Sequence, residues 1–169
     1  MHIAENLIRK SRYMLNNIQF RDLIVKPTLE DIGLYSPEAE NLLIMTMAHE
    51  SNGGEYLEQY PTGPALGVFQ MEKGTFNDLW DRYLADKYDL VRKIMTACNL
   101  FHEPVAEEMI DDLALATAMA RIYYLRVREP IPSDLDEMAA YAKKYWNTEL
   151  GKATATDYLS AYLRFEKNT

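Results

Sequence analysis

The stretch from Asn41 to Met71, NLLIMTMAHESNGGEYLEQYPTGPALGVFQM, decides how the fold is interpreted. Its first part, Leu42–Ala48, is apolar at almost every position, which is typical of a helix buried on all sides. The pair Gly53-Gly54 then ends this helix, because glycine readily adopts the left-handed conformation found at helix ends. Glu50 lies between the two, so the pattern predicts a carboxylate at the C-terminal end of a core helix.

That position affects the pKa of Glu50. The negative end of the helix dipole and the partial loss of water both disfavour the charged form, so both raise the pKa. A carboxylic acid that stays protonated near neutral pH can donate a proton to the oxygen of a leaving group. We therefore predict that Glu50 is a general acid. The alternative is a solvated glutamate at a helix end.

The rest of the chain predicts an all-α fold in a single domain, residues 1–169, with residues 1–35 forming N-terminal helices that pack on it. Ser36, Thr75 and Ser133 are the expected helix caps. Negative charge at Asp111-Asp112 favours a helix start there. The predicted helices cover residues 3–18, 20–25, 28–32, 37–50, 76–84, 86–100, 113–128, 134–146 and 156–165, with a short one opened by Glu103-Pro104.

Composition excludes several classes of function. A chain that is 48% hydrophobic and 26% charged is not disordered. The net charge of −8 leaves no basic patch to bind phosphates, so nucleic acid is not an expected partner. No apolar run reaches the length of a membrane span, and the N-terminus lacks a basic region followed by an apolar one. We therefore expect neither membrane insertion nor a secretory signal.

No cofactor and no metal are predicted. His49-Glu50 begins like the zinc motif His-Glu-x-x-His, but Gly53 occupies the position of the second histidine. His2 and His102 are remote in the sequence. Cys98 lies in a helical apolar pattern, which indicates a buried structural thiol.

Three short elements, in this order, resemble the lytic transglycosylases, relatives of goose-type lysozyme. Glu50-Ser51 is similar to the Glu-Ser pair of that family, Gly67–Met71 (GVFQM) to its Gly-Leu-Met-Gln element, and Ala139–Tyr141 (AAY) to its Ala-Ala-Tyr-Asn element. The run PALGVFQM looks most like the small phage-encoded branch. The resemblance covers about residues 36–148 and implies a lysozyme-like domain with a substrate cleft.

The resemblance implies cleavage of the β-1,4 bond between N-acetylmuramic acid and N-acetylglucosamine in peptidoglycan. In this family one glutamate, here Glu50, protonates the glycosidic oxygen. It then removes a proton from the sugar's own 6-hydroxyl, which closes a 1,6-anhydro ring. The partner is a peptidoglycan glycan strand, reached from a phage virion or, after release from the host cytoplasm, through a holin pore. In a virion, tail or baseplate proteins are further partners.

Substrate-binding side chains are also implied. Ser51 orients the glutamate or the segment after it, Gln70 hydrogen-bonds the sugar near the cleavage point, and Tyr141 points its hydroxyl at Glu50 or at the sugar. A tyrosine from a helix beside the catalytic one corresponds to Tyr123 or Tyr124. The alternatives are a serine that bonds its own helix end, a glutamine that ties loop backbone together, and core tyrosines.

The chain departs from the family after Tyr141, where Ala142 replaces the expected asparagine. The contribution of that asparagine is missing, or Trp146 or Asn147 supplies it. The lobe over residues 53–67 contains Tyr56 and Tyr60. These tyrosines either stack on a sugar or are simply half-buried in the loop.

Two other functions stay open. A hydrolase such as an endolysin needs a second carboxylate. Glu55, Glu58 and Asp78 are the candidates, although each is more simply a surface charge. A tail or baseplate structural protein with this fold and little activity is the alternative outside enzymes, and the acidic composition and Ala142 favour it slightly.

Overall fold

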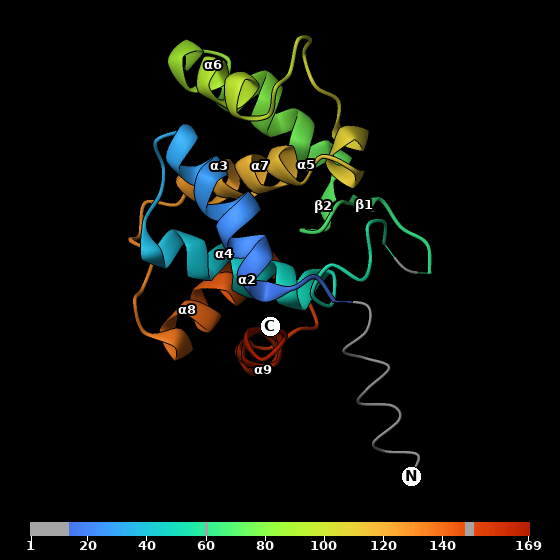
Figure 1. The fold of residues 1–169 in the computed structure, drawn as a ribbon, viewed down its shortest axis with the longest axis vertical. Coiled ribbons are helices and arrows are strands. Elements are labelled where there is room, and N and C mark those ends of the chain that lie inside the picture. Colours follow the sequence, from blue (N-terminus) through green and yellow to red (C-terminus); the bar gives the residue numbers. More distant parts are fainter. Residues whose placement is uncertain (1–13, 60, 148–150) are drawn as a thin grey trace.

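The computed structural model describes residues 14–59, 61–147 and 151–169. This part of the chain is mostly helical, as the sequence predicts (Figure 1). The elements are α2 (Asn17–Phe20), η1 (Arg21–Val25), α3 (Lys26–Asp31), α4 (Pro37–Glu50), β1 (Ala65–Leu66), β2 (Met71–Glu72), α5 (Lys73–Asp78), η2 (Leu79–Tyr83), α6 (Tyr88–Ala97), η3 (Ala106–Ile110), α7 (Leu113–Leu125), α8 (Leu135–Ala142), η4 (Lys143–Asn147) and α9 (Ala155–Glu166).

Helix α4 is the centre of the core. The hydroxyl oxygen of Ser36 accepts a hydrogen bond from the Ala39 amide at 3.0 Å, and Pro37 occupies the first helical position, as predicted. Every residue from Leu42 to Ala48 is buried. Each fully buried Leu, Ile or Met contributes about 1.5–3 kcal/mol through the hydrophobic effect. Helix α4 packs against α7, α8 and α9, so it is held on several sides (Figure 1).

A short hairpin follows the irregular lobe after α4. Strand β1 pairs antiparallel with β2, with Ala65 opposite Glu72 and Leu66 opposite Met71. The connecting residues form a turn with positive φ at Gly67 (71°) and Gln70 (51°). The sequence of residues 68–71 indicates a short extended segment or a turn, and the structure agrees. The turn places Gln70 at its end.

The N-terminal helices differ from the prediction. Residues 3–13 of the predicted helix 3–18 lie outside the described residues; residues 14–16 are not helical, and Asn16 caps α2 instead. The expected stop before Pro27 is also wrong, because α3 runs through this proline. The segment before it, η1, is a π-helix, in which an amide bonds the carbonyl five residues earlier, as Lys26 N does with Arg21 O. These bonds replace the regular α-helical hydrogen-bond pattern that a proline interrupts.

Several predicted helix ends shift by a few residues. Helix α5 begins at Lys73, so Thr75 is not its cap. Asp134 replaces Ser133 as the cap of α8, since its carboxylate accepts hydrogen bonds from two backbone amides, both at 3.0 Å. Helix α7 ends at Leu125 instead of residue 128. Helix α9 begins after Thr154, which forms a capping box with Asp157. The spacing of its apolar residues predicts that Leu163 faces inward, but Leu163 is 45% exposed.

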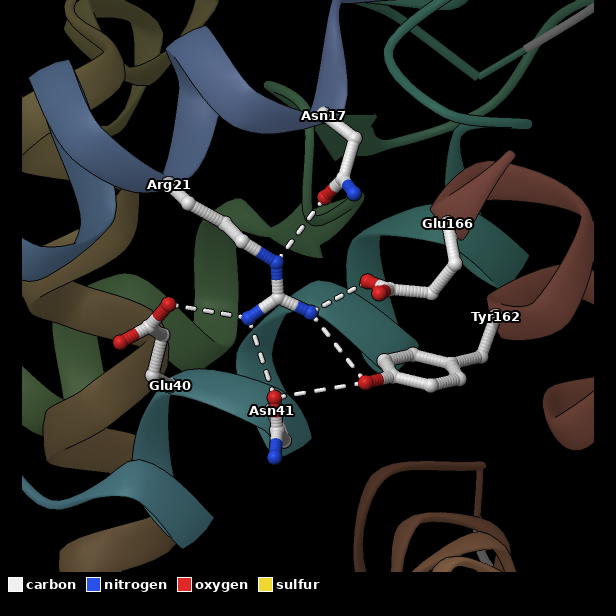
Figure 2. Close-up of polar contacts among 6 residues, drawn as sticks. All are labelled: Asn17, Arg21, Glu40, Asn41, Tyr162 and Glu166. Atoms are coloured by element: carbon white, nitrogen blue, oxygen red, sulfur yellow. Dashed lines mark hydrogen bonds and ion pairs between the residues drawn. The ribbon is translucent and has the colours of Figure 1, made fainter. Parts of the chain in front are cut away.

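Arg21 joins the N-terminal helices to the core (Figure 2). Its guanidinium donates to Asn17 at 2.9 Å, to Glu40 at 2.9 Å and to Asn41 at 3.0 Å. It also donates to the hydroxyl of Tyr162 at 3.2 Å and to Glu166, both on α9. One side chain therefore connects α2, α4 and α9. We call these residues the Arg21 cluster.

Two further findings concern the chain as a whole. In the described part of the chain, no helix has both the length and the apolar character needed to cross a bilayer. Cys98 is buried, which confirms the structural thiol, and burial raises its pKa to about 12.

Candidate functional site

A cleft of about 550 Å³ opens at the C-terminal end of α4. Glu50 lines it together with Gln70 from the hairpin turn and Tyr123 from α7, so three of the predicted site residues line the same cleft. Segments far apart in the sequence build the cleft. The other described residues that line it are Tyr56, Gln59, Ala65, Met71, Glu72, Thr75, Trp146 and Asn147.

Glu50 has the electrostatics of a proton donor. Burial raises its pKa to about 7, and a hydrogen bond from the Tyr158 hydroxyl to Oε1 partly opposes this shift. The carboxyl group is therefore protonated in a large fraction of molecules at neutral pH, while its carboxylate form remains accessible. The sequence predicted the direction of the pKa change, and burial is its main cause.

Tyr158 is a site residue that sequence reasoning did not assign. It lies on α9, where the apolar spacing of residues 156–165 places it on the inward face, and it is fully buried. Its ring also lies against His49, with the centroids 4.1 Å apart. The apolar stripe of α9 indicates a buried face but gives no sign that one hydroxyl reaches a carboxylate 108 positions away in the chain. Only the packing of α9 on α4 creates the pair.

Gln70 stabilises the turn through its side-chain nitrogen, while its side-chain oxygen accepts no hydrogen bond from the described residues. Its amide nitrogen Nε2 and its backbone N–H both donate to the carbonyl oxygen of Gly67 at 2.9 Å, which stabilises the hairpin turn. Within the described residues, its side-chain oxygen accepts no hydrogen bond, and the residue lines the cleft. That oxygen is available to a ligand N–H or O–H group.

Aromatic side chains form part of the cleft wall. The hydroxyl of Tyr123 donates to the carbonyl oxygen of Tyr145 at 2.7 Å, which fixes the ring. Trp146 packs edge-on against that ring, with the centroids 4.7 Å apart. Tyr56 lines the cleft and is half-buried, whereas Tyr60 lies outside the described residues. Trp146 and Asn147, the proposed substitutes for the missing asparagine, are both in the cleft.

Three predicted residues do not reach the cleft. Ser51 is fully buried, where its hydroxyl donates to Met47 O at 3.1 Å and accepts from the Gly54 amide at 2.9 Å; it thereby orients the segment after Glu50. Tyr124 is buried and shares a hydrogen bond of 2.8 Å with Thr46. The expected contact of Tyr141 with Glu50 is wrong, because its hydroxyl donates to the Glu129 carbonyl at 3.1 Å.

The predicted second carboxylates are also elsewhere. Glu55 accepts a hydrogen bond from Asn52, and Asp78 forms ion pairs with Arg126 at 3.2 Å and Arg82 at 3.6 Å. Neither they nor Glu58 line the described part of the cleft. The carboxylate found there with Glu50 is Glu72, which the sequence analysis did not single out.

The described residues hold no group of three His, Cys, Asp or Glu side chains arranged as metal ligands. The site is thus a partly buried acid that accepts a hydrogen bond from Tyr158, in an open cleft that aromatic and amide side chains also line. Comparison of the chain with protein-family models, with curated proteins and with solved structures finds no match.

Proposed function

We propose that the protein cleaves the glycan strand of peptidoglycan at the β-1,4 bond between N-acetylmuramic acid and N-acetylglucosamine, with Glu50 as the single acid and base. The observation that carries the proposal is the pKa of Glu50, raised to about 7 by burial, in a residue that lines a cleft large enough for sugar rings. The resemblance of three short elements to lytic transglycosylases is the second support.

The reaction uses both protonation states of Glu50. Protonated Glu50 donates to the glycosidic oxygen, and the bond from that oxygen to the anomeric carbon breaks. The carboxylate that remains removes the proton from the 6-hydroxyl of the same muramic acid, whose oxygen bonds to the anomeric carbon and closes the 1,6-anhydro ring. Glu50 ends protonated again. A pKa near the working pH suits a group that must first give and then take a proton.

Tyr158 and the cleft wall support these steps. The Tyr158 hydroxyl donates to the carboxylate formed between the two proton transfers and so stabilises it. The faces of Tyr123 and Trp146 give apolar surfaces on which the C–H faces of a sugar ring can pack. The free oxygen of Gln70 can accept from the acetamido N–H of the substrate.

Hydrolysis is a second candidate because Glu72 lines the same cleft as Glu50. A second carboxylate in the same cleft can act as the base for water or as the nucleophile. In that reaction Glu50 keeps its role as proton donor, and the product carries a reducing end in place of the anhydro ring.

Digestion of purified peptidoglycan tests both routes. The wild type, Glu50→Gln, Glu72→Gln and the control Glu58→Gln are incubated with walls, and the released muropeptides are weighed by mass spectrometry. We expect anhydro products, lighter by one water than reducing-end products, from the wild type and Glu58→Gln, and none from a folded Glu50→Gln. Reducing ends that disappear in Glu72→Gln mean hydrolysis. No release from any of several wall types by the wild type contradicts the enzyme proposal and favours the structural tail or baseplate component.

A further inference from the structure

A second hollow adjoins the cleft on the other side of Tyr123. It has a volume of about 540 Å³ and is lined by Tyr123, Arg126, Val127, Arg128, Glu129 and Tyr145. Because Tyr123 lines both spaces, a ligand held against this ring in the cleft is one side chain away from the hollow. We call it the arginine hollow.

Two guanidinium groups give the arginine hollow its character. Arg126 lies over the Tyr123 ring, 4.7 Å from its centroid, and one of its nitrogens is 3.2 Å from Asp78. Arg128 is exposed and forms no ion pair with any residue that the structure describes. The carboxylate of Glu129 is already paired with Lys144 at 3.0 Å.

A guanidinium beside the cleft that has no ion-pair partner among the described residues is notable in a chain with a net charge of −8. The planar group of Arg matches a carboxylate, with which it forms two parallel hydrogen bonds. Position, charge and shape thus all favour an anionic group on the molecule that occupies the cleft.

We propose that the arginine hollow binds a carboxylate carried by the substituent of muramic acid, so that the protein recognises the acidic side groups of the strand as well as its sugars. This inference rests on the proposed function. Two sources supply the same chemistry: the carboxylates of the stem peptide, and the lactyl carboxylate left when that peptide is removed.

Binding to soluble glycan strands tests the inference separately from catalysis. Fluorescently labelled strands are titrated with the Glu50→Gln protein, which does not consume them, and with the same protein carrying Arg128→Gln. The matched control is Arg92→Gln, which removes an exposed arginine from α6 that pairs with Asp89. Three substrates are used: intact strands, strands whose carboxylates have been converted to neutral amides by carbodiimide and ammonia, and strands trimmed by an amidase.

We expect Arg128→Gln to weaken binding to intact strands by about 3- to 5-fold, which corresponds to the usual free-energy contribution of an exposed ion pair. The loss should be smaller on amidated strands, and Arg92→Gln should leave both affinities unchanged. A loss that persists on trimmed strands identifies the lactyl carboxylate, and one that disappears identifies the stem peptide. No loss, or an equal loss on intact and amidated strands, overturns the inference. Activity of the wild type is measured in parallel, so a failure of the proposed function is seen independently.

Discussion

At the scale of single residues, the state of Glu50 results from two opposing influences. Burial raises its pKa, and the hydrogen bond from Tyr158 lowers it. The second influence depends on tertiary structure, since the packing of α9 on α4 supplies the hydroxyl. The pKa of about 7 therefore reflects both the burial of Glu50 and this one helix contact.

The pH dependence of activity follows from this balance. Glu50 must be protonated to start the reaction, so kcat/KM should fall as the pH rises through about 7. In Tyr158→Phe the influence that lowers the pKa is lost, so the midpoint of this fall should move to higher pH. The rate should also drop by about 10- to 100-fold, because the carboxylate loses a charge-assisted hydrogen bond.

The measurement is a pH profile of muropeptide release for both proteins. Tyr162→Phe is the matched control, because it removes a hydroxyl one helical turn away that contacts Arg21 instead of Glu50. A midpoint that stays in place or moves to lower pH in Tyr158→Phe would contradict the assigned role.

At the scale of elements, the sequence predicted well the features that depend on neighbouring residues, such as where a helix begins. Ser36-Pro37 predicted the start of α4, and the apolar run predicted that the helix is buried. The end of the helix at Glu50 followed from these two signals together with the glycines after it. The π-helical segments η1, η2 and η4 have no comparable sequence signal, and η1 underlies the wrong helix end predicted before Pro27. Likewise, Glu50 and Gln70 lie in recognisable local motifs and were found, whereas the hydrogen bond from Tyr158 to Glu50 depends on tertiary packing. Glu72 lines the cleft close to Gln70, but no motif marks it in the sequence.

The hairpin turn gives a prediction at this scale. A Cβ at Gly67 would lie 2.4 Å from the carbonyl oxygen of Met109, and the residue has a φ of 71°. Gly67→Ala should therefore destabilise the protein by about 1–3 kcal/mol and displace Gln70, which raises KM. Urea denaturation and steady-state kinetics measure the two effects.

Gly74 is the matched control, because it lies in α5 and a Cβ there meets nothing within 4 Å. Gly74→Ala should be neutral or stabilise the protein by about 0.5–1 kcal/mol through helix propensity. Equal effects of the two substitutions would show that the close approach at Gly67 does not matter.

At the scale of the whole molecule, the Arg21 cluster joins parts that are distant in sequence. Removal of the guanidinium leaves Glu40 and Glu166 without their partner, and the side chain of Glu40 is only 13% exposed. Arg21→Met should therefore reduce the free energy of unfolding by about 3 kcal/mol. Arg21→Lys should restore only part of this, since an ammonium group lacks the fork geometry.

Thermal and urea denaturation measure both variants. Arg92→Met, which breaks an exposed pair with Asp89, should cost less than about 1 kcal/mol and serves as the control. If Arg21→Met and Arg92→Met are equally stable, the cluster does not hold the N-terminal helices on the core.

Helix α9 carries Tyr158 on one turn and Tyr162 on the next, the first bound to Glu50 and the second to Arg21. Glu50 is thus synthesised before its hydrogen-bond donor, which lies 108 positions further along the chain. On the ribosome, a nascent chain that has not yet reached residue 158 contains Glu50 without that donor. The pair forms only when α9 folds back on α4, so a growing chain acquires its tuned acid in one step after residue 158 has been made.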